Sequence, residues 1–193
     1  MEKFQNKYRI PSARLKGYDY GTNGLYYVTI CTKNRIHYFG EINRQTDVET
    51  HNCASLIDSR AALIKNCAAL RPSIIGQTAL DYWGKIPIHY PFVELDEFVV
   101  MPNHIHGILF FNRSKTIASN PNQFGVQSKN LGAVIRGFKS TLKRYANQNN
   151  IEFEWQARYH DRIIRNENEL NAIRQYIINN PTNWQTISTP PVS

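Results

Sequence analysis

The chain has 193 residues, of which 41% are hydrophobic and 20% charged, a composition that excludes disordered and fibrous proteins. Lysine and arginine number 23 against 15 aspartates and glutamates, so the formal net charge is +8 and a polyanionic partner is favoured. Three scattered cysteines argue against a disulfide framework and against a cysteine zinc site. With no signal core and no apolar run of membrane-spanning length, the sequence predicts one cytoplasmic domain over 1–193, without a membrane partner.

The first expected elements are two strands. Residues 24–32 are rich in β-branched and aromatic side chains, and 36–42 resume that pattern, so together they are expected to form a hairpin or one bent strand. Helices are expected over 58–70 and from 73 to 84, as two helices or as one bent helix. The stretch near 43–72 is interpreted as an irregular insertion.

Two further strands and a helix follow. Residues 92–101 and 104–111 are expected to be strands joined by a Pro-Asn turn. The second of these is apolar on both faces and is therefore expected to be central in the sheet. Residues 112–129 are interpreted as an irregular linker. A strongly amphipathic pattern predicts a helix over 131–145.

The C-terminal part is expected to hold a strand over 159–164 and a helix from Asn166 to Asn180, which ends there because Pro181 cannot continue it. A polar tail over 186–193 is expected to fray. Mostly antiparallel strands with helices packed on one face predict an α+β fold.

The sharpest local motif is His104-Ile105-His106. Side chains alternate along a strand, so the two imidazoles point to the same side. Two neutral imidazoles side by side suit a divalent metal, although such pairs also occur by chance on exposed strands. Among the other histidines, His160 is a candidate for the same site.

The last helix carries Tyr176 and Asn180, which lie together along one edge of its apolar stripe. A tyrosine can act as a covalent nucleophile toward phosphorus when a nearby cation or base assists it. An amide oxygen from Asn180 can complete a metal site of the kind that suits Mg²⁺ or Mn²⁺. The alternative is a tyrosine at the edge of the core and an asparagine that only caps the helix.

Taken together, these motifs resemble those of a known enzyme family. The segment 101–107, followed by an apolar run, resembles the HUH motif of single-tyrosine transposases. The segments 27–32, 155–166 and 176–181 are similar to those of the REP-associated tyrosine transposases and their insertion-sequence relatives. The likeness extends over about 8–184 and is interrupted by the two insertions near 43–72 and 112–129.

The resemblance implies a ferredoxin-like or RRM-like antiparallel sheet of the HUH endonuclease type, with helices packed on it. It also implies that His104 and His106 are metal ligands, Tyr176 is the nucleophile and Asn180 is a third ligand. Members of this family cleave single-stranded DNA beside hairpins through a 5′-phosphotyrosine intermediate and rejoin it. Insertion-sequence members act as homodimers and REP-associated members as monomers, so the oligomeric state stays open.

Basic residues on the N-terminal arm and on the helix over 131–145 are candidates for contact with single-stranded or hairpin DNA, because Arg and Lys neutralise phosphates. They are Lys7, Arg9, Arg14, Lys16, Arg136, Lys139, Lys143 and Arg144. Solvated surface charge is the alternative explanation for each of them.

Two other functions fit the same motifs. One is a domesticated DNA-binding protein of this fold that no longer transposes. The other is a zinc-dependent hydrolase that uses the histidine pair with His160 or Asp161 as a third ligand. Only a nucleophilic role for Tyr176 predicts a covalent protein–DNA adduct that is lost when this tyrosine becomes phenylalanine.

Overall fold

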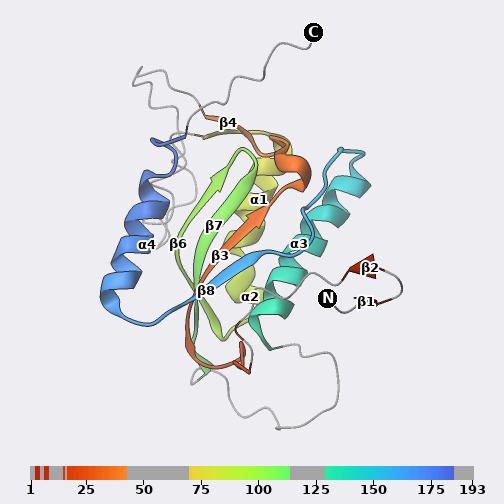
Figure 1. Ribbon diagram of the computed structural model, residues 1–193. Helices are drawn as coiled ribbons and strands as arrows, with labels where there is room; N and C mark the ends of the chain where they lie inside the picture. Colours follow the sequence, from red (N-terminus) through yellow and green to blue (C-terminus); the bar gives the residue numbers. More distant parts are fainter. Residues whose placement is uncertain are drawn as a thin grey trace.

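The centre of the fold is a four-stranded antiparallel sheet, seen in a computed structural model that describes residues 3–4, 7–8, 15, 17–42, 70–113 and 129–184. Its strands, in spatial order, are β6 (Val93–Met101), β7 (His104–Phe111), β3 (Gly24–Cys31) and β8 (His160–Ile164). Each neighbouring pair is antiparallel. The expected central position of 104–111 is confirmed, since β7 lies between β6 and β3 (Figure 1).

Two helices connect these strands into a β-α-β-β-α-β order. Helix α1 (Ile74–Gly84) lies between β3 and β6, and α3 (Leu131–Gln148) lies between β7 and β8. This order, with the second and third strands of the repeat on one side of the first and the fourth on its other side, is the ferredoxin-like topology. The predicted fold class is therefore confirmed.

Helices α1 and α3 cover one face of the sheet and enclose the main core. The helix α1 begins where the Ser73 side chain accepts a hydrogen bond from the Gly76 amide, and Trp83 near its end is fully buried. A Cβ at Gly107 would lie 2.3 Å from Trp83, so only glycine lets the indole pack directly against β7. This contact fixes the strand that carries the histidine pair.

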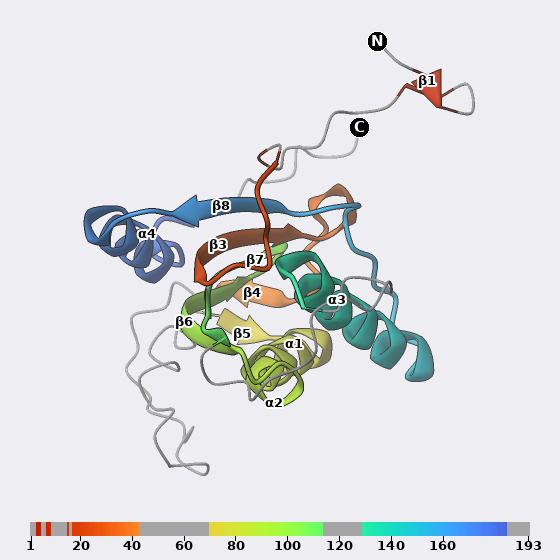
Figure 2. The same cartoon turned by 90° about the horizontal axis from the view of Figure 1, so that it is seen from below.

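The helix α4 (Glu167–Asn179) packs on the opposite face, and the expectation that all helices share one face is therefore wrong (Figure 2). Its apolar side chains meet a second buried cluster that includes Met101 and Ile108. The position of α4 is also fixed by Arg174, whose Nε and Nη2 donate to the two carboxylate oxygens of Asp96 on β6 at 2.8 and 2.6 Å. Asp96 lies within an irregularity of β6, where the pairing with β7 shifts register.

Several sequence-based expectations for the first half of the chain need correction. The strand expected over 36–42 is reduced to β4 (Gly40–Ile42), which pairs with β5 (Leu70–Pro72) and not with β3. Asn34 and Arg35 adopt positive φ angles in a short 3-10 turn, and this turn redirects the chain away from β3. Residues 70–72 form strand β5. The expected helix over 58–70 and the expected insertion near 43–72 were therefore both predicted to extend too far toward the C-terminus.

The remaining elements agree closely with expectation. The helix expected from 73 to 84 is α1, and the short helix α2 (Ile86–His89) that follows it was not expected from the sequence. The structure does not describe residues 43–69, 114–128 and 185–193. Most of the helix expected over 58–70, most of the linker expected over 112–129 and the whole tail over 186–193 therefore lie outside the described residues. At the N-terminus, β1 (Lys3–Phe4) pairs with β2 (Lys7–Tyr8). None of the helices described is long and apolar enough to cross a membrane.

Candidate functional site

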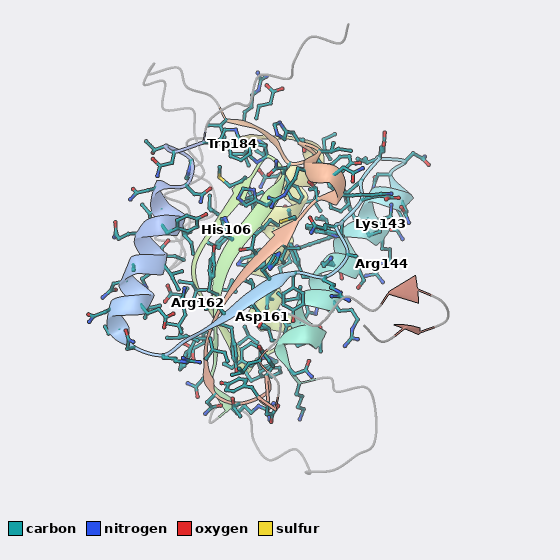
Figure 3. The ribbon with its side chains drawn as sticks, viewed as in Figure 1. His106, Lys143, Arg144, Asp161, Arg162 and Trp184 are labelled. Carbon is teal, nitrogen blue, oxygen red and sulfur yellow. The ribbon has the colours of Figure 1, made fainter. Side chains whose placement is uncertain are left out.

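The two histidines of β7 lie side by side on the face of the sheet that α4 covers. His104 and His106 are 7% and 5% exposed, and their ring centroids are 4.5 Å apart. The expectation that both imidazoles point to one side is therefore confirmed. Figure 3 shows His106 on the sheet, with Trp184 beyond it toward the start of β7.

The ring of His104 is oriented by Asn103. The Nδ2 of Asn103 donates to the carbonyl oxygen of Arg35 at 3.1 Å, so its Oδ1 faces the imidazole, and His104 Nδ1 lies 2.7 Å from that oxygen. An amide oxygen can only accept a hydrogen bond, so Nδ1 of His104 carries the hydrogen. The lone pair of the neutral ring is consequently on Nε2, the nitrogen available to a metal.

The ring of His106 contacts two hydroxyl groups from β3. Thr29 is directly opposite His106 in the sheet, and Tyr27 projects from the same face two residues away. The Nδ1 of His106 lies 2.7 Å from Tyr27 Oη and 2.9 Å from Thr29 Oγ1. Burial raises the pKa of Tyr27 to about 12, so this phenol stays neutral at physiological pH.

Burial keeps both imidazoles neutral. Desolvation, with a smaller contribution from the nearby Arg35 cation, lowers the pKa of His104 to about 4, and a hydrogen bond with Asn180 opposes this shift. The pKa of His106 is lowered to about 3, mainly by desolvation and to a smaller extent by the charges of His104 and Arg35. Neutral imidazoles are the form that binds metal ions, so both rings are ready as ligands at neutral pH.

The helix α4 brings the predicted tyrosine and asparagine to the same place. The Tyr176 ring meets the His106 ring edge-on, with centroids 5.3 Å apart, and its side chain is 53% exposed. The side chain of Asn180, the C-terminal cap of α4, lies close enough to His104 to raise the pKa of that imidazole. After the helix, the Trp184 ring lies 5.9 Å from His104. The four predicted site residues are therefore neighbours in the fold.

This donor set fits a divalent ion. Each imidazole is neutral and is held through Nδ1, which is the arrangement that metal-binding histidines use. Within the described part of the chain, no group of three or more His, Cys, Asp or Glu side chains could hold a metal. His160 lies opposite Thr29, two strands from His106, or about 10 Å by the spacing of strands. A zinc site with His160 or Asp161 as third ligand therefore lacks support here.

The basic residues predicted to contact DNA have different surroundings. Lys139 donates to the carbonyl oxygens of Gln156 and Arg158, and Lys143 donates to that of Phe153, so both ammonium groups hold the segment before β8 against α3. Arg136 and Arg144 are exposed. Figure 3 shows Lys143 and Arg144 on α3, apart from His106.

The same helix and segment border a groove of about 400 Å³ with a largely apolar floor that includes Trp155. Of the residues on the N-terminal arm that were predicted to contact DNA, the structure describes Lys7 alone, and only its backbone. Arg9, Arg14 and Lys16 lie outside the described residues.

Sequence reasoning assigned no role to four residues that border the site: Tyr27, Thr29, Arg35 and Asn103. Asn103 lies within the segment 101–107 and directly precedes His104, so a signal for it was present in the sequence. Thr29 and Tyr27 come into view only once the register of β3 against β7 is known. Arg35 is exposed and acts on both imidazoles through its charge.

Comparisons with known proteins find matches over most of the chain. An uncharacterised protein of Haemophilus influenzae is 33% identical over 184 residues, which is 90% of this chain and 89% of the relative. No family model matches. A structure of the REP-associated tyrosine transposase bound to a REP hairpin gives a TM-score of 0.49 at 16% identity, over 90% of this chain and 73% of that one. A proposed transposase of Deinococcus radiodurans R1 gives 0.34 at 19% identity, over 87% and 97%.

Proposed function

We propose that this chain, which belongs to the same protein family as the Haemophilus influenzae protein, is a metal-dependent single-stranded DNA endonuclease or transposase. In this proposal the chain cleaves and rejoins DNA next to hairpins through Tyr176. The observation that carries it is the contact between this exposed tyrosine and the buried, neutral His106, whose ring adjoins that of His104. A nucleophile next to a pair of metal-binding imidazoles is what phosphoryl transfer to tyrosine requires.

The chemistry assigned to Tyr176 is an in-line displacement at phosphorus. Its phenolic oxygen forms a bond to the phosphorus, and the bond from phosphorus to the 3′-oxygen breaks. The phenol loses a proton and the departing 3′-oxygen gains one, so the products are a 5′-phosphotyrosine and a free 3′-hydroxyl. Rejoining is the reverse reaction. The exposure of Tyr176 allows an extended strand to reach it without rearrangement of the core.

His104 and His106 would hold the divalent cation through Nε2, and Asn180 would add an amide oxygen. An Mg²⁺ or Mn²⁺ ion there would polarise the scissile phosphate and stabilise the charge that develops on it. Asn103 keeps the His104 ring in the required orientation. The exposed Arg136 and Arg144, with the basic N-terminal arm, are proposed to bind DNA phosphates away from the site.

The test is to incubate the protein with a panel of single strands that carry hairpins, in Mn²⁺ or Mg²⁺, and to look for a protein–DNA adduct that survives denaturation. Wild type is expected to form the adduct, and Tyr176→Phe is expected to form none. Tyr145→Phe is the matched control, because this tyrosine lies on α3 and packs against Tyr82 on the other face of the sheet. Chelation of the metal with EDTA is expected to abolish the adduct as well.

The outcomes separate the candidate functions. DNA binding without an adduct across the panel would support a domesticated binding protein. Cleavage that persists in Tyr176→Phe would support a hydrolase that uses activated water. An adduct that persists in Tyr176→Phe would place the nucleophile elsewhere and would refute the assignment.

A further inference from the structure

Tyr27 and Thr29 form a small hydroxyl network against the metal-site histidine His106. Besides the two contacts to Nδ1, Thr29 Oγ1 donates to Tyr27 Oη at 3.3 Å. The rings of Tyr27 and His106 are stacked, with centroids 5.6 Å apart and planes inclined by 22°. The imidazole is therefore fixed by hydrogen bonds at one nitrogen and by stacking on one face.

The direction of these hydrogen bonds sets the tautomer of His106. A threonine hydroxyl has one hydrogen, and Thr29 uses it toward Tyr27. With that hydrogen used, Thr29 Oγ1 is an acceptor toward His106 Nδ1 at 2.9 Å, and Tyr27 Oη can accept from the same nitrogen at 2.7 Å, so both contacts are hydrogen bonds together only when Nδ1 carries the hydrogen. The lone pair of the ring is left on Nε2. In His104 the amide oxygen of Asn103 has the same effect, because it also accepts a hydrogen bond from Nδ1.

We propose that Tyr27 and Thr29 are positioning residues that orient His106 and hold it in the tautomer with a free Nε2 lone pair. This inference rests on the proposed function, because it gives the pair a purpose in metal binding. The residues that orient a metal-binding histidine typically change metal affinity 10- to 100-fold when they are replaced. Neither residue is assigned a direct contact with metal or DNA.

The two tyrosines at the site thereby have separate tasks. Tyr27 is on a central strand, and its hydroxyl is engaged with His106 and Thr29. Tyr176 is on the helix surface and is 53% exposed. A covalent adduct is therefore expected on Tyr176 alone, and replacement of Tyr27 is expected to weaken metal binding without transferring or removing the nucleophile.

The experiment uses the full chain with Tyr27→Phe, Thr29→Val and the double substitution. The control is Tyr26→Phe, because Tyr26 directly precedes Tyr27 in β3, lies on the opposite face and donates its hydroxyl to the Thr22 carbonyl instead. Two quantities are measured. One is the Mn²⁺ dissociation constant by calorimetry, and the other is the His106 imidazole tautomer in the metal-free protein by nitrogen-15 NMR.

The expected result is Mn²⁺ affinity at least 10-fold weaker in Tyr27→Phe and in Thr29→Val, with wild-type affinity in Tyr26→Phe. In the metal-free protein, wild-type His106 is expected to carry its hydrogen on Nδ1, and the double variant is expected to lose this preference. Unchanged affinity and an unchanged tautomer in the double variant would overturn the inference. Equal weakening in Tyr26→Phe would also overturn it, because the effect would then be one of general stability.

The NMR measurement separates this inference from the proposed function. If wild type binds no Mn²⁺, the metal-dependent function fails, while the tautomer of the metal-free protein still decides whether Tyr27 and Thr29 orient His106. If wild type binds Mn²⁺ but forms no adduct, the nuclease activity fails and the positioning role is decided by both readouts.

Discussion

The burial of two neutral histidines predicts that the metal-free protein loses stability as the pH falls from 7.5 to 5.5. The pKa of each imidazole is about 6.5 in the unfolded chain, and burial lowers it to about 4 for His104 and about 3 for His106 in the folded state. Below pH 6.5 the unfolded state therefore binds protons that the folded state does not. The stabilisation is complete above pH 6.5 and is lost as the pH falls toward 4.

The size of the loss follows from the two titration curves. At pH 5.5, each unfolded imidazole is mostly protonated and each folded one is still neutral, which gives a loss of about 1 kcal/mol per histidine relative to pH 7.5. The pair loses about 2–3 kcal/mol. This figure depends little on the folded values, because both lie well below 5.5. Carboxylates contribute little in this interval, since their unfolded pKa values are about 4.5 or lower.

The assay is urea unfolding in EDTA at pH 7.5 and at pH 5.5, for wild type and for the double variant His104→Gln, His106→Gln. The difference in the free energy of unfolding between the two pH values should be about 2–3 kcal/mol larger in wild type. The double variant corrects for every other titrating group. Equal pH dependence in the two proteins would show that the histidines protonate without penalty in the folded state, and that burial does not keep them neutral.

Three further substitutions test other parts of the structure. Arg35→Gln should raise the pKa of both site imidazoles, measured by NMR titration in EDTA, whereas Lys33→Gln in the same turn should leave them close to wild type; equal shifts would assign the effect to net charge. Arg174→Met should cost about 2 kcal/mol in urea unfolding, since it leaves the half-buried Asp96 unpaired, and an unchanged midpoint would remove this ion pair from the factors that hold α4. Gly107→Ala should cost about 2–3 kcal/mol, because its Cβ would overlap the tryptophan ring beneath β7; a stable variant would mean that the ring can move.

The parts of the fold that the sequence predicts well are those with local signals. The strand pattern over 104–111, which is apolar on both faces, and the apolar stripe that starts at Leu131 each reflect one element that packs against the core. The pairing of β4 with β5 has no such signal, because its two strands are far apart in sequence and each is only three residues long. The face that α4 covers is equally nonlocal, since its apolar stripe fits either side of a sheet that is buried on both.

The candidate site divides in the same way. The motif supplies His104 and His106, and periodicity places Tyr176 on the edge of α4. The role of Thr29 depends on the register of two strands whose residues differ by 77 positions along the chain. The engagement of Lys139 with backbone carbonyls also depends on a packed loop. Side chains that orient or support the site are consequently found from contacts, and those that do chemistry are found from residue type and spacing.

One coincidence of spacing explains why the motif on the strand and the motif on the helix can form one site. Tyr176 and Asn180 are four residues apart on a helix, a rise of about 6 Å. His106 and His104 are two residues apart on a strand, a distance of about 6.6 Å. The contact of Tyr176 with His106 and that of Asn180 with His104 then require α4 to run opposite to β7, and they follow together once either is made. A shift of α4 by one turn along the sheet would break both of these contacts. The bidentate ion pair between Arg174 of α4 and Asp96 of β6 opposes such a shift, so it helps to place both the nucleophile and the third donor.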